Sequence, residues 1–358
     1  MKIGIFDPYL DTLAGGEKYI LSAAICLANQ HEVSLFWDND KVSLIKANAQ
    51  KKFGIDLSKI NFEENIFSKN TTFFSRLLKS SKYDQIIFLS DGSIPTVLSK
   101  LVLHFQTPVE WVDGKAIKTK IKLKKVSQII CNSEYTKKYI DRNFSVKSKV
   151  IYPPVSIPDK LFISEKENFI LNVGRFGVNN QGSSYKKQEV LIEVFKKMID
   201  DGLKDWSFRV IVSLLDKDVK QLDYLQSKLK DYPIKLIVNP DNKTLWKNYS
   251  QSKIYWHASG FGEDLRLHPD RAEHFGISTV EAMGAGAVPV VINAGGQREI
   301  VTEGKNGYLW DTEKDLIEKT LSLIGNSELL AKISSQSIHD SKIFSEMEFC
   351  KKITSNLT

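Results

Sequence analysis

Two glutamates eight positions apart, Glu273 and Glu281, stand in a stretch that combines carboxylates, glycines and an apolar run. The pattern predicts a loop, a short helix with Ser278 as its N-cap, a buried strand over 288–292 and a second turn at Gly295–Gly296. A helix start that faces the end of a parallel strand attracts anions, because its unpaired backbone N–H groups and its dipole both favour negative charge. The stretch therefore predicts a binding site for a molecule that carries an anionic group.

Basic residues precede this stretch in an arrangement that suits a diphosphate. Arg175 follows an expected strand over 168–173, and Lys186 and Lys187 stand at the head of the next expected helix. Arginine offers a planar fork of donors to phosphate oxygens, and lysine offers a point charge. The start of the helix adds backbone N–H donors and the positive end of its dipole. Counting back from the apolar positions of the helix favours Lys186 as the phosphate contact, with Lys187 as the alternative. Either cation taken alone is more often a solvated surface residue.

Three further places lie where expected strands end or expected helices begin. Gly15 and Gly16 precede an expected helix over 18–29. Adjacent glycines let a ligand approach the backbone, although a flexible turn is the more common explanation. His104 ends an expected strand, but a lone histidine is more often a hydrogen-bonded structural residue than a catalytic one. Asn239 follows another expected strand, at the kind of strand end where ligands bind.

The run Glu273-His-Phe-Gly-Ile-Ser-Thr-Val-Glu281, together with Gly-x-Val-Pro-Val-Val and Gly295-Gly296-x-x-Glu299 after it, resembles the Glu-x7-Glu region of family 4 glycosyltransferases. Two glutamates at this spacing would be a weak signal, whereas the whole string is strong. Members of that family are retaining enzymes of the GT-B fold. The resemblance implies an α/β chain of two Rossmann-like parallel-sheet domains that face each other across a cleft.

The resemblance also implies roles for individual residues. Glu273 would lie close to the reacting centre and hold sugar hydroxyls, while Arg175 and Lys186 would neutralise the leaving diphosphate. His104 would contact the transferred sugar. Glu281 would bind the ribose hydroxyls, unless it only completes the capping box of its own helix. The other expected contacts with the substrates are Gly15, Gly16, Lys187, Asn239, His274, Phe275, Gly276, Ile277, Gly295 and Gly296.

Length and composition favour two domains. A chain of 358 residues with 42% hydrophobic content is too long for one ordinary core, and three prolines within 151–159 mark a boundary. We expect an N-terminal acceptor-side domain over 1–155 and a nucleotide-sugar-binding domain over 156–334. As in GT-B folds, a C-terminal helix of about 335–358 would pack back on the first domain. The expected strands cover 2–6, 32–37, 85–89, 101–105, 128–131, 168–173, 208–213, 234–238, 254–256 and 288–292.

The net charge of +7 is unevenly distributed along the chain. Residues 1–157 hold 23 Lys and Arg against 15 Asp and Glu, whereas the remainder holds 27 against 28. Lys115–Lys125 contains six lysines and no acid. This run suits the headgroups of an anionic membrane, and a solvated helix face is the alternative. Nucleic acid is a poorer partner for the run, which lacks the aromatic residues and arginines used in stacking and base readout.

The cysteines and the first residues bear on the compartment. No apolar run is long enough to cross a membrane, and the chain enters a strand pattern without signal-peptide features. We therefore expect the mature chain to begin at its first residue. Cys26, Cys131 and Cys350 are widely spaced among apolar residues, which favours buried thiols in a reducing compartment over a disulfide or zinc framework. The expected location is the cytoplasm, with peripheral attachment at the inner face of the membrane.

Two polar segments are interpreted as surface features. Asp38-Asn-Asp40 follows a strand pattern, as does the metal-binding Asp-x-Asp of GT-A transferases, but nothing else in the chain fits that fold. We interpret it as a solvated turn and expect neither a metal nor a cofactor, because a nucleotide sugar would be a substrate. The long polar segment over 259–272 could shape a sugar pocket, but a surface insertion is the preferred interpretation.

The residues and the resemblance together predict a retaining glycosyltransferase. It would move a hexose-type sugar from a UDP- or GDP-linked donor to a glycan or lipid-linked acceptor. One alternative is another GT-B enzyme that acts on nucleotide sugars, such as an epimerase. A second alternative is a non-catalytic nucleotide-sugar-binding protein. The chain carries no pattern that distinguishes uracil from guanine or that names the acceptor.

Overall fold

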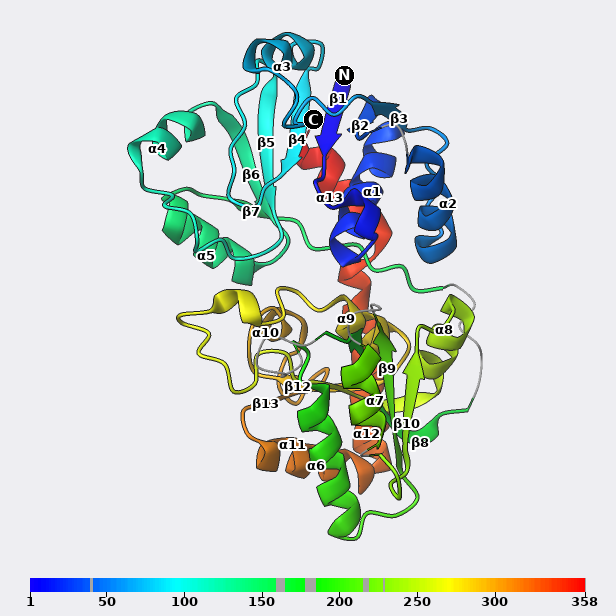
Figure 1. Cartoon of the computed structure of the whole chain (residues 1–358). Helices are drawn as coiled ribbons and strands as arrows, with labels where there is room; N and C mark the ends of the chain where they lie inside the picture. The colour runs from blue at the N-terminus through cyan, green and yellow to red at the C-terminus, as the bar shows by residue number, and fades with distance from the viewer. Residues whose placement is uncertain (39–40, 159–164, 178–184, 215–218, 228, 358) are drawn as a thin grey trace. The chain divides into compact units, whose positions relative to one another are not determined.

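The computed structural model describes residues 1–38, 41–158, 165–177, 185–214, 219–227 and 229–357. The chain divides into two compact units, shown in Figure 1. Unit 1 comprises Met1–Pro154 and Glu346–Thr358, and unit 2 comprises Val155–Ser345. The change of unit at Pro154 falls within the proline-rich segment 151–159, of which residue 159 lies outside the described residues.

Unit 1 is built on a seven-stranded parallel sheet in the order β3-β2-β1-β4-β5-β6-β7. Its strands are β1 (Lys2–Phe6), β2 (Glu32–Phe36), β3 (Asn61–Glu63), β4 (Gln85–Leu89), β5 (Lys100–Phe105), β6 (Val126–Cys131) and β7 (Lys149–Val150). Its helices are α1 (Gly15–Ala28), α2 (Val42–Phe53), α3 (Phe73–Ser80), α4 (Ile117–Leu123), α5 (Glu134–Phe144) and α13 (Glu346–Leu357). A 3-10 turn, η1 (Leu10–Thr12), precedes α1.

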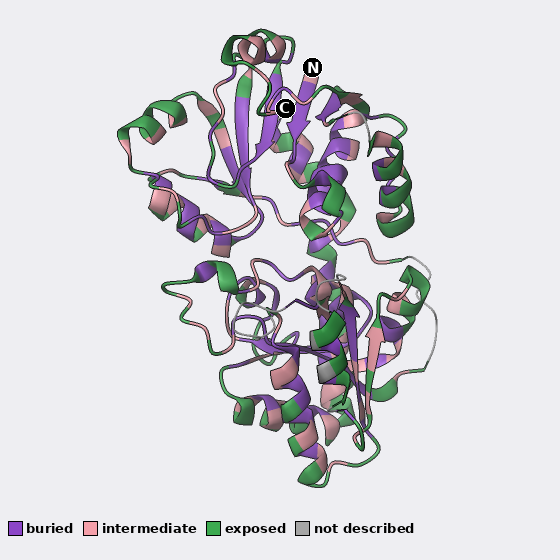
Figure 2. Cartoon of the chain, viewed as in Figure 1, coloured by how far each residue is buried: buried purple, intermediate pink, exposed green. Residues whose placement is uncertain are grey.

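The central strands of unit 1 are apolar along their length because both faces of the sheet are covered. Side chains alternate between the faces, so Ile3 and Ile5 of β1 pack in the same cluster as α1. Phe6 points to the opposite face and stacks on Phe88 of β4, with ring centroids 4.9 Å apart. Figure 2 shows the central strands buried, whereas α2 and α5 each combine buried and exposed residues.

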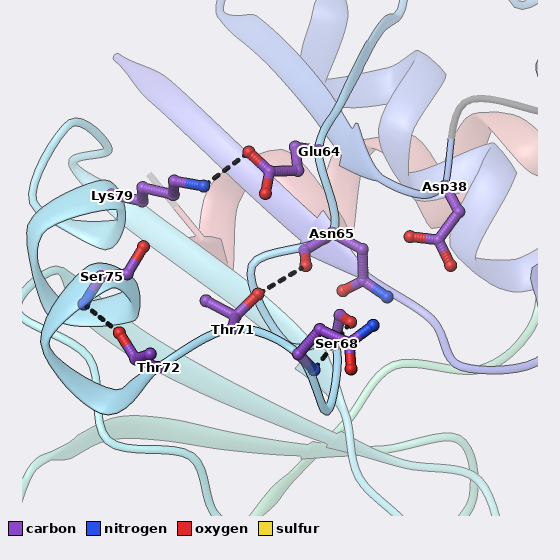
Figure 3. A pocket seen from close by; sticks show the side chains of 9 residues that line it. Asp38, Glu64, Asn65, Ser68, Thr71, Thr72, Ser75 and Lys79 are labelled. Atoms are coloured by element: carbon purple, nitrogen blue, oxygen red, sulfur yellow. Dashed lines mark hydrogen bonds and ion pairs between the residues drawn. The ribbon is translucent and has the colours of Figure 1, made fainter.

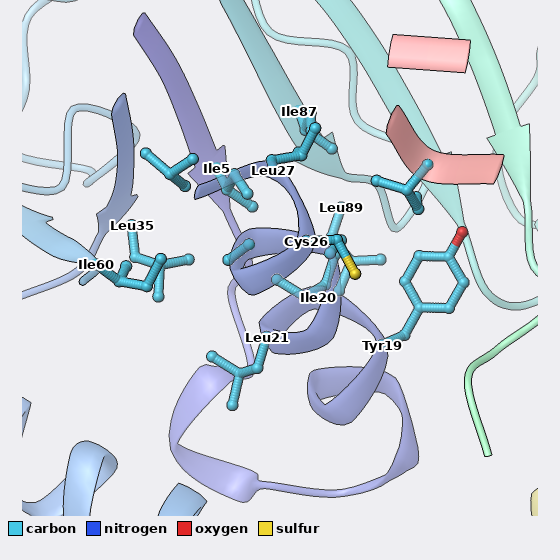
Figure 4. Packing of buried hydrophobic residues seen from close by; sticks show 14 of the residues in the cluster. Ile5, Tyr19, Ile20, Leu21, Cys26, Leu27, Leu35, Ile60, Ile87 and Leu89 are labelled. Carbon is cyan, nitrogen blue, oxygen red and sulfur yellow. The ribbon is translucent and has the colours of Figure 1, made fainter. Parts of the chain in front are cut away.

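A disulfide joins the two ends of unit 1. Helix α13 packs along α1, and this contact brings Cys26 and Cys350, 324 positions apart, to a Cα–Cα distance of 5.1 Å. Cys26 lies among apolar side chains of α1 and β4 (Figure 4). The expectation of three free thiols is therefore wrong for two of them, whereas Cys131 is a buried free cysteine. The cysteine-based argument for a reducing compartment no longer holds, because disulfides are rare in such compartments.

Unit 2 is built on a six-stranded parallel sheet in the order β10-β9-β8-β11-β12-β13. Its strands are β8 (Glu167–Arg175), β9 (Ser207–Ser213), β10 (Ile234–Val238), β11 (Ser252–His257), β12 (Val288–Ile292) and β13 (Tyr308–Trp310). Its helices are α6 (Gln188–Asp200), α7 (Val219–Ser227), α8 (Asn242–Gln251), α9 (Ile277–Gly284), α10 (Gln297–Ile300), α11 (Glu313–Ile324) and α12 (Ser327–Ser341). The described part of unit 2 also contains the 3-10 turns η4 (Pro269–Arg271) and η5 (Lys342–Phe344).

Buried aromatic side chains fill much of the core of unit 2. Trp256 of β11 is fully buried and lies against Phe195 of α6 and Phe208 of β9. Its Nε1–H donates to the hydroxyl of Thr320 at 3.0 Å, which satisfies the one polar atom of the ring. The strand ends around this core are therefore fixed in position, and loops that follow them are held at one edge of the sheet.

The C-terminal segment differs from the expected single helix over about 335–358. Helix α12 ends at Ser341, and η5 separates it from α13. Only α13 belongs to unit 1, because its apolar residues Phe349 and Ile353 join the core beside α1. None of the described helices combines the length and apolar character that crossing a membrane requires.

Candidate functional site in unit 2

The carboxyl ends of β8 and β11 mark the point in unit 2 where the strand order reverses. From β8 the sheet continues to β9 and β10 on one side, and from β11 it continues to β12 and β13 on the other. Ligands of open parallel sheets bind outside the strand ends at such a switch point, because the loops diverge there and leave room. Arg175 ends β8 and His257 ends β11. The switch point therefore places a cation and an imidazole at one edge of the sheet.

Glu273 is the centre of the charge network at this edge. Its Oε2 lies 2.6 Å from Nζ of Lys186 and 3.0 Å from Nε2 of His257. The side chain of Glu273 is 18% exposed and that of Lys186 is 28% exposed, so water screens the pair only partly. Lys186 lies over Gly174, where a Cβ atom would come within 3.3 Å of the lysine stem. The fold thus brings together two predicted site residues that are 87 positions apart.

The protonation states in this network follow from burial and charge. Burial acts to raise the pKa of Glu273, but the Lys186 charge and the His257 hydrogen bond outweigh it and hold the pKa well below its ordinary value. Burial lowers the pKa of His257, with Glu273 opposing that shift. At neutral pH the carboxylate is therefore ionised and the imidazole is neutral. The Nε2–H of His257 must then donate to Glu273, which leaves Nδ1 as a buried acceptor.

The second predicted lysine, Lys187, belongs to a different network. Its Nζ lies 2.6 Å from Oε1 of Glu263, and Oε2 of Glu263 lies 2.7 Å from Nη1 of Arg271. Hydrogen bonds from Lys187 and Arg271 lower the pKa of Glu263. Glu263 comes from the segment over 259–272. The interpretation of that segment as a mere surface insertion is corrected, because it supplies the partner that holds Lys187 beside the site.

The turn at Gly295 and Gly296 lets the Glu273 loop approach it closely. A Cβ atom on Gly295 would stand 2.2 Å from the carbonyl oxygen of Glu273, and one on Gly296 would stand 2.5 Å from that of His274. The N–H of Gly296 donates to the carbonyl of Glu273 at 2.7 Å. Both glycines therefore have a steric role in placing Glu273, whether or not they contact a substrate.

Helix α9 begins before Ser278, with Gly276 at its N-cap and a φ of 124° there. The predicted capping box of Ser278 and Glu281 does not form, because Ser278 lies inside the first turn. The hydroxyl of Tyr255 donates to Oγ of Ser278 at 2.8 Å, and that of Tyr249 donates to Oε2 of Glu281 at 2.9 Å. The capping explanation of Glu281 is therefore wrong, and its contact with a ribose stays a prediction.

Arg175 and Asn239 both stand at strand ends, but their side chains differ in what they contact. The Arg175 side chain is exposed and forms no ion pair within the described part of the chain. Its carbonyl accepts from Nε2 of Gln188 at 3.2 Å, which ties β8 to the start of α6. Oδ1 of Asn239 accepts from the N–H of Leu214 at 2.8 Å, so this side chain joins two loops. Between Arg175 and Lys186, positions 178–184 lie outside the described residues.

The residues that follow Glu273 have mainly packing contacts. Phe275 is buried and packs edge-on against Phe344, with ring centroids 5.3 Å apart. Nε2 of His274 lies 3.0 Å from the carbonyl oxygen of Asp270, which holds the ring against the preceding turn. Ile277 is half-buried at the first position of α9. These three side chains hold the loop in place, and their predicted contacts with a substrate stay predictions.

In unit 1, Gly15 and Gly16 are the first two residues of α1 rather than a loop before it. A Cβ atom on Gly16 would stand 2.2 Å from Oε1 of Gln106, whose Nε2 donates to the carbonyl of Gly16. Oε2 of Glu17 accepts from the N–H of Ala14 at 2.5 Å. A carboxylate of the chain thus occupies the start of this helix, which makes it less suited to a phosphate than the glycines suggested.

His104, the predicted sugar contact of unit 1, is 1% exposed. Its ring stacks on that of Tyr19 with centroids 4.2 Å apart. Burial lowers the pKa of His104 to about 3, with the backbone of Ile130 opposing the shift, so the ring is neutral at neutral pH. A direct contact with a sugar would require the ring to become accessible, and the role stays a prediction.

Asp38 lines a polar hollow of unit 1 (Figure 3). The hollow encloses about 450 Å³, and its lining residues are Asp38, Glu64, Asn65, Ser68, Asn70, Thr71, Thr72, Ser75 and Lys79. Nζ of Lys79 lies 2.5 Å from Oε2 of Glu64. Asp40, the other acid of the Asp-x-Asp segment, lies outside the described residues. Among the residues that are described, no group of three or more His, Cys, Asp or Glu is placed to hold a metal ion.

Three residues of the site escaped the sequence analysis. His257 had a usable signal, because it directly follows the apolar run of β11 and so lies at a carboxyl strand end, as His104 does. Glu263 and Tyr249 had none, because their partners Lys187 and Glu281 are 76 and 32 positions away. Pairing across such distances is set by the tertiary fold and leaves no local pattern.

Replacing His104 with glutamine should reduce the dependence of stability on acid. The pKa of the histidine is about 3 in the folded chain and near 6.5 in the unfolded chain. Below pH 6.5 the unfolded state therefore binds a proton that the folded state does not, and the free energy of unfolding falls as the pH drops. Between pH 7 and pH 5 the wild type should lose about 1 to 2 kcal/mol more unfolding free energy than His104→Gln. Denaturant unfolding at both pH values measures this difference. Equal losses in the two proteins would contradict the buried neutral imidazole.

Residues 156–340, just over half of the chain, match the family described as glycosyl transferases group 1. An uncharacterised glycosyltransferase of Methanocaldococcus jannaschii is 29% identical over 220 residues, covering 61% of this chain and 55% of that protein. A GDP-Man:Man(3)GlcNAc(2)-PP-Dol alpha-1,2-mannosyltransferase of Kluyveromyces lactis is 22% identical over 383 residues, covering 87% of this chain and 64% of that one. The chain spans about half the length of the curated relatives it matches.

Solved structures share the fold over the whole chain. The Anabaena protein HepE, crystallised with UDP, superposes with a TM-score of 0.74 at 16% identity and covers 100% of this chain and 99% of its own. Sucrose-phosphate synthase from Thermosynechococcus elongatus gives a TM-score of 0.70 at 13% identity, with coverage of 99% and 98%. These likenesses and the two parallel-sheet units confirm the predicted GT-B fold. From the match over residues 156–340, this chain belongs to the glycosyl transferases group 1 family.

Proposed function

We propose that this chain is a retaining glycosyltransferase of the family 4, Glu-x7-Glu type. It moves a hexose-type sugar from a UDP- or GDP-linked donor to a glycan or lipid-linked acceptor. The observation that carries the proposal is the contact of Lys186, Glu273 and His257 at the β8/β11 switch point. A cation, an ionised carboxylate and a neutral imidazole within hydrogen-bond reach of one another suit a sugar that is joined to a diphosphate.

Departure of the diphosphate is the step that the cations assist. Breaking the anomeric C–O bond builds positive charge on the sugar and negative charge on the leaving oxygen. Lys186 and the exposed guanidinium of Arg175 lie at the same strand edge and supply positive charge there. The N-terminus of α9 adds the positive end of a helix dipole. These groups belong to the chain itself, so the proposed reaction needs no metal ion or cofactor.

The proposed role of Glu273 is to hold the hydroxyls of the donor sugar. An ionised carboxylate only accepts hydrogen bonds, and sugar hydroxyls are donors. Because Lys186 and His257 keep Glu273 ionised, it stays an acceptor throughout the pH range in which enzymes work. It also places negative charge near the anomeric carbon, where positive charge develops.

The choice of base and sugar rests on relatives, which point in different directions. HepE was solved with UDP-glucose, whereas two relatives carry names that specify GDP-mannose. Tyr249 holds one oxygen of Glu281, and we propose that the carboxylate also accepts from the ribose of the nucleotide. UDP and GDP both contain a ribose, so this contact does not distinguish uracil from guanine. The base has to be identified by measuring which nucleotide binds.

Replacing Glu273 with glutamine should separate binding from transfer. The wild type should release free nucleotide from its nucleotide sugar only when an acceptor glycan is present, which also distinguishes a transferase from an epimerase. The nucleotide should still stabilise Glu273→Gln, by about 2.7 kcal/mol of unfolding free energy at one hundred times the dissociation constant. A thermal-shift assay detects this stabilisation. The turnover of this variant should fall about a hundredfold, or roughly 3 kcal/mol in the barrier. Unchanged turnover in Glu273→Gln, or no turnover in the wild type with any acceptor, would refute the proposal.

Helix α4 is the part of unit 1 that we propose to contact an anionic membrane. The lysines of Lys115–Lys125 are all exposed, and no residue of α4 is buried. Ile117 and Ile121, four positions apart on one face of the helix, are 78% and 58% exposed. Basic side chains would lie on the headgroups while the isoleucines enter the interface. The proposed location is the inner face of the membrane, and this proposal rests on the lysines of α4 and not on the cysteines.

Vesicle binding tests the membrane contact. Each lysine near an anionic surface adds about 1 kcal/mol, so removing four of them should abolish salt-dependent binding to phosphatidylglycerol vesicles. The variant changes to glutamine the residues Lys118, Lys120, Lys122 and Lys124. Replacing Lys204, an exposed lysine of unit 2, is the control and should leave binding as in the wild type. Sedimentation with vesicles measures both, and equal binding by the fourfold variant would refute the contact.

A further inference from the structure

Helix α13 is separated in sequence from the rest of unit 1 by the whole of unit 2. Its residues Phe349, Ile353 and Leu357 are each at most 4% exposed and belong to the same apolar cluster as α1. They recur every four positions, which places them on a single stripe of the helix. The residues between them are exposed or half-buried. A narrow apolar stripe therefore anchors α13 on unit 1.

The Cys26–Cys350 disulfide lies beside this stripe. Cys350 directly follows Phe349 and is half-buried, whereas Cys26 of α1 is 5% exposed. The bond joins residues 324 positions apart and so closes a loop that contains the whole of unit 2. A cross-link over so long a loop restricts the opened chain strongly. Without the bond, α13 would be held on α1 by noncovalent contacts alone.

The seam between α1 and α13 reaches a residue of the predicted site. The ring of Tyr19 packs edge-on against Phe349 at a centroid distance of 4.9 Å and stacks on His104 at 4.2 Å. The Tyr19 hydroxyl donates to the carbonyl of Ile151 at 3.1 Å. Tyr19 and Cys26 are seven positions apart, and Figure 4 shows both side chains on one side of α1. The position of α13 therefore helps to fix Tyr19 over the His104 ring.

The surroundings of the protein decide whether such a bond persists. The inner face of a membrane, proposed above from the lysines of α4, borders a compartment that keeps thiols reduced. Disulfides found in reducing compartments are usually transient and redox-sensing. A bond between two helices of one unit, next to a predicted site residue, is therefore suited to reversible opening.

The reaction that opens the bond is thiol–disulfide exchange with a dithiol. A thiolate of the dithiol attacks Sγ of Cys350, the more exposed of the two sulfurs, and the Cys26 thiolate leaves and takes up a proton. The second thiol of the reagent then attacks the mixed disulfide and releases Cys350, leaving the reagent as a disulfide. Two electrons and two protons pass from the dithiol to the cysteine pair.

We propose that Cys26 and Cys350 form a redox-sensitive fastener, which binds α13 to α1 when oxidised and lets the helix open locally when reduced. In the oxidised chain Phe349 stays against Tyr19, and the ring of His104 stays covered. In the reduced chain local opening of α13 leaves Tyr19 free to move off that ring, at a cost below that of unfolding the unit. The contact of His104 with a sugar rests on the proposed transferase function, and the reduced form is then the active one. The release of α13 does not depend on that function.

Amide hydrogen exchange of the full chain tests the release of α13. Dithiothreitol should speed exchange of the α13 amides by about tenfold or more and leave those of α6 in unit 2 unchanged. Cys350→Ser should show the fast exchange of α13 with or without the reagent. Cys131→Ser is the matched control, because it changes the buried free cysteine and keeps a hydroxyl beside Ser148. It should respond to dithiothreitol as the wild type does.

Labelling of histidines tests the coupling to His104. Diethyl pyrocarbonate acylates accessible neutral imidazoles, and mass spectrometry of the peptides measures the rate at each position. His104 should react about fivefold or more faster in Cys350→Ser than in the oxidised wild type. His339, whose side chain is 76% exposed, is the internal reference and should react equally in both.

The outcomes separate the fastener from the function of unit 2. Equal exchange of α13 in the oxidised and reduced proteins, or free thiols at both positions after oxidation in air, would overturn the fastener. Equal labelling of His104 in the two proteins would overturn its coupling to α13. Neither measurement uses a donor or an acceptor, so a failure to find any transfer would count against the proposed function alone.

Discussion

The site in unit 2 depends on one ion pair, between Lys186 and Glu273. A charge taken out of water costs several kcal/mol unless a partner and hydrogen bonds replace the lost solvation, and both side chains are mostly buried. Each therefore requires the other, and His257 supplies the further hydrogen bond that the carboxylate needs. Lys186 precedes α6, Glu273 follows η4 and His257 ends β11, so the pair forms only when the loops after both central strands are in place.

A steric constraint supports that electrostatic one. The Glu273 loop can reach its position only because Gly295 and Gly296 leave room for its backbone. Lys187 forms an ion pair with Glu263, whereas Lys186 forms one with Glu273. The two adjacent lysines therefore belong to different networks and do not compete for one carboxylate.

Local patterns predicted much of this molecule. β1, β4, β10 and β12 have the bounds that the sequence predicted, because each contains a short and mainly apolar run. The short strands β3, β7 and β13 were not predicted, since two or three residues carry no periodicity. The start of α9 was placed too late, because Ser278 has the residue type of a cap while Gly276 has the backbone conformation for one. Lys186 and Glu273 were assigned to one site from the sequence, and the structure shows them in contact. The disulfide and the partners of Lys187 and Glu281 could not be predicted, since each depends on contacts between distant segments.

Calorimetry of UDP binding tests the central claim most directly. It compares the wild type with two matched variants, Lys186→Ala and Lys187→Ala. If the Lys186–Glu273 pair faces the diphosphate, Lys186→Ala should weaken UDP binding by about tenfold or more. Lys187→Ala should leave the affinity nearly unchanged and lower the melting temperature instead, because it leaves Glu263 with one partner fewer. Equal affinity of wild type and Lys186→Ala, or a loss confined to Lys187→Ala, would contradict the assignment of the phosphate contact to Lys186.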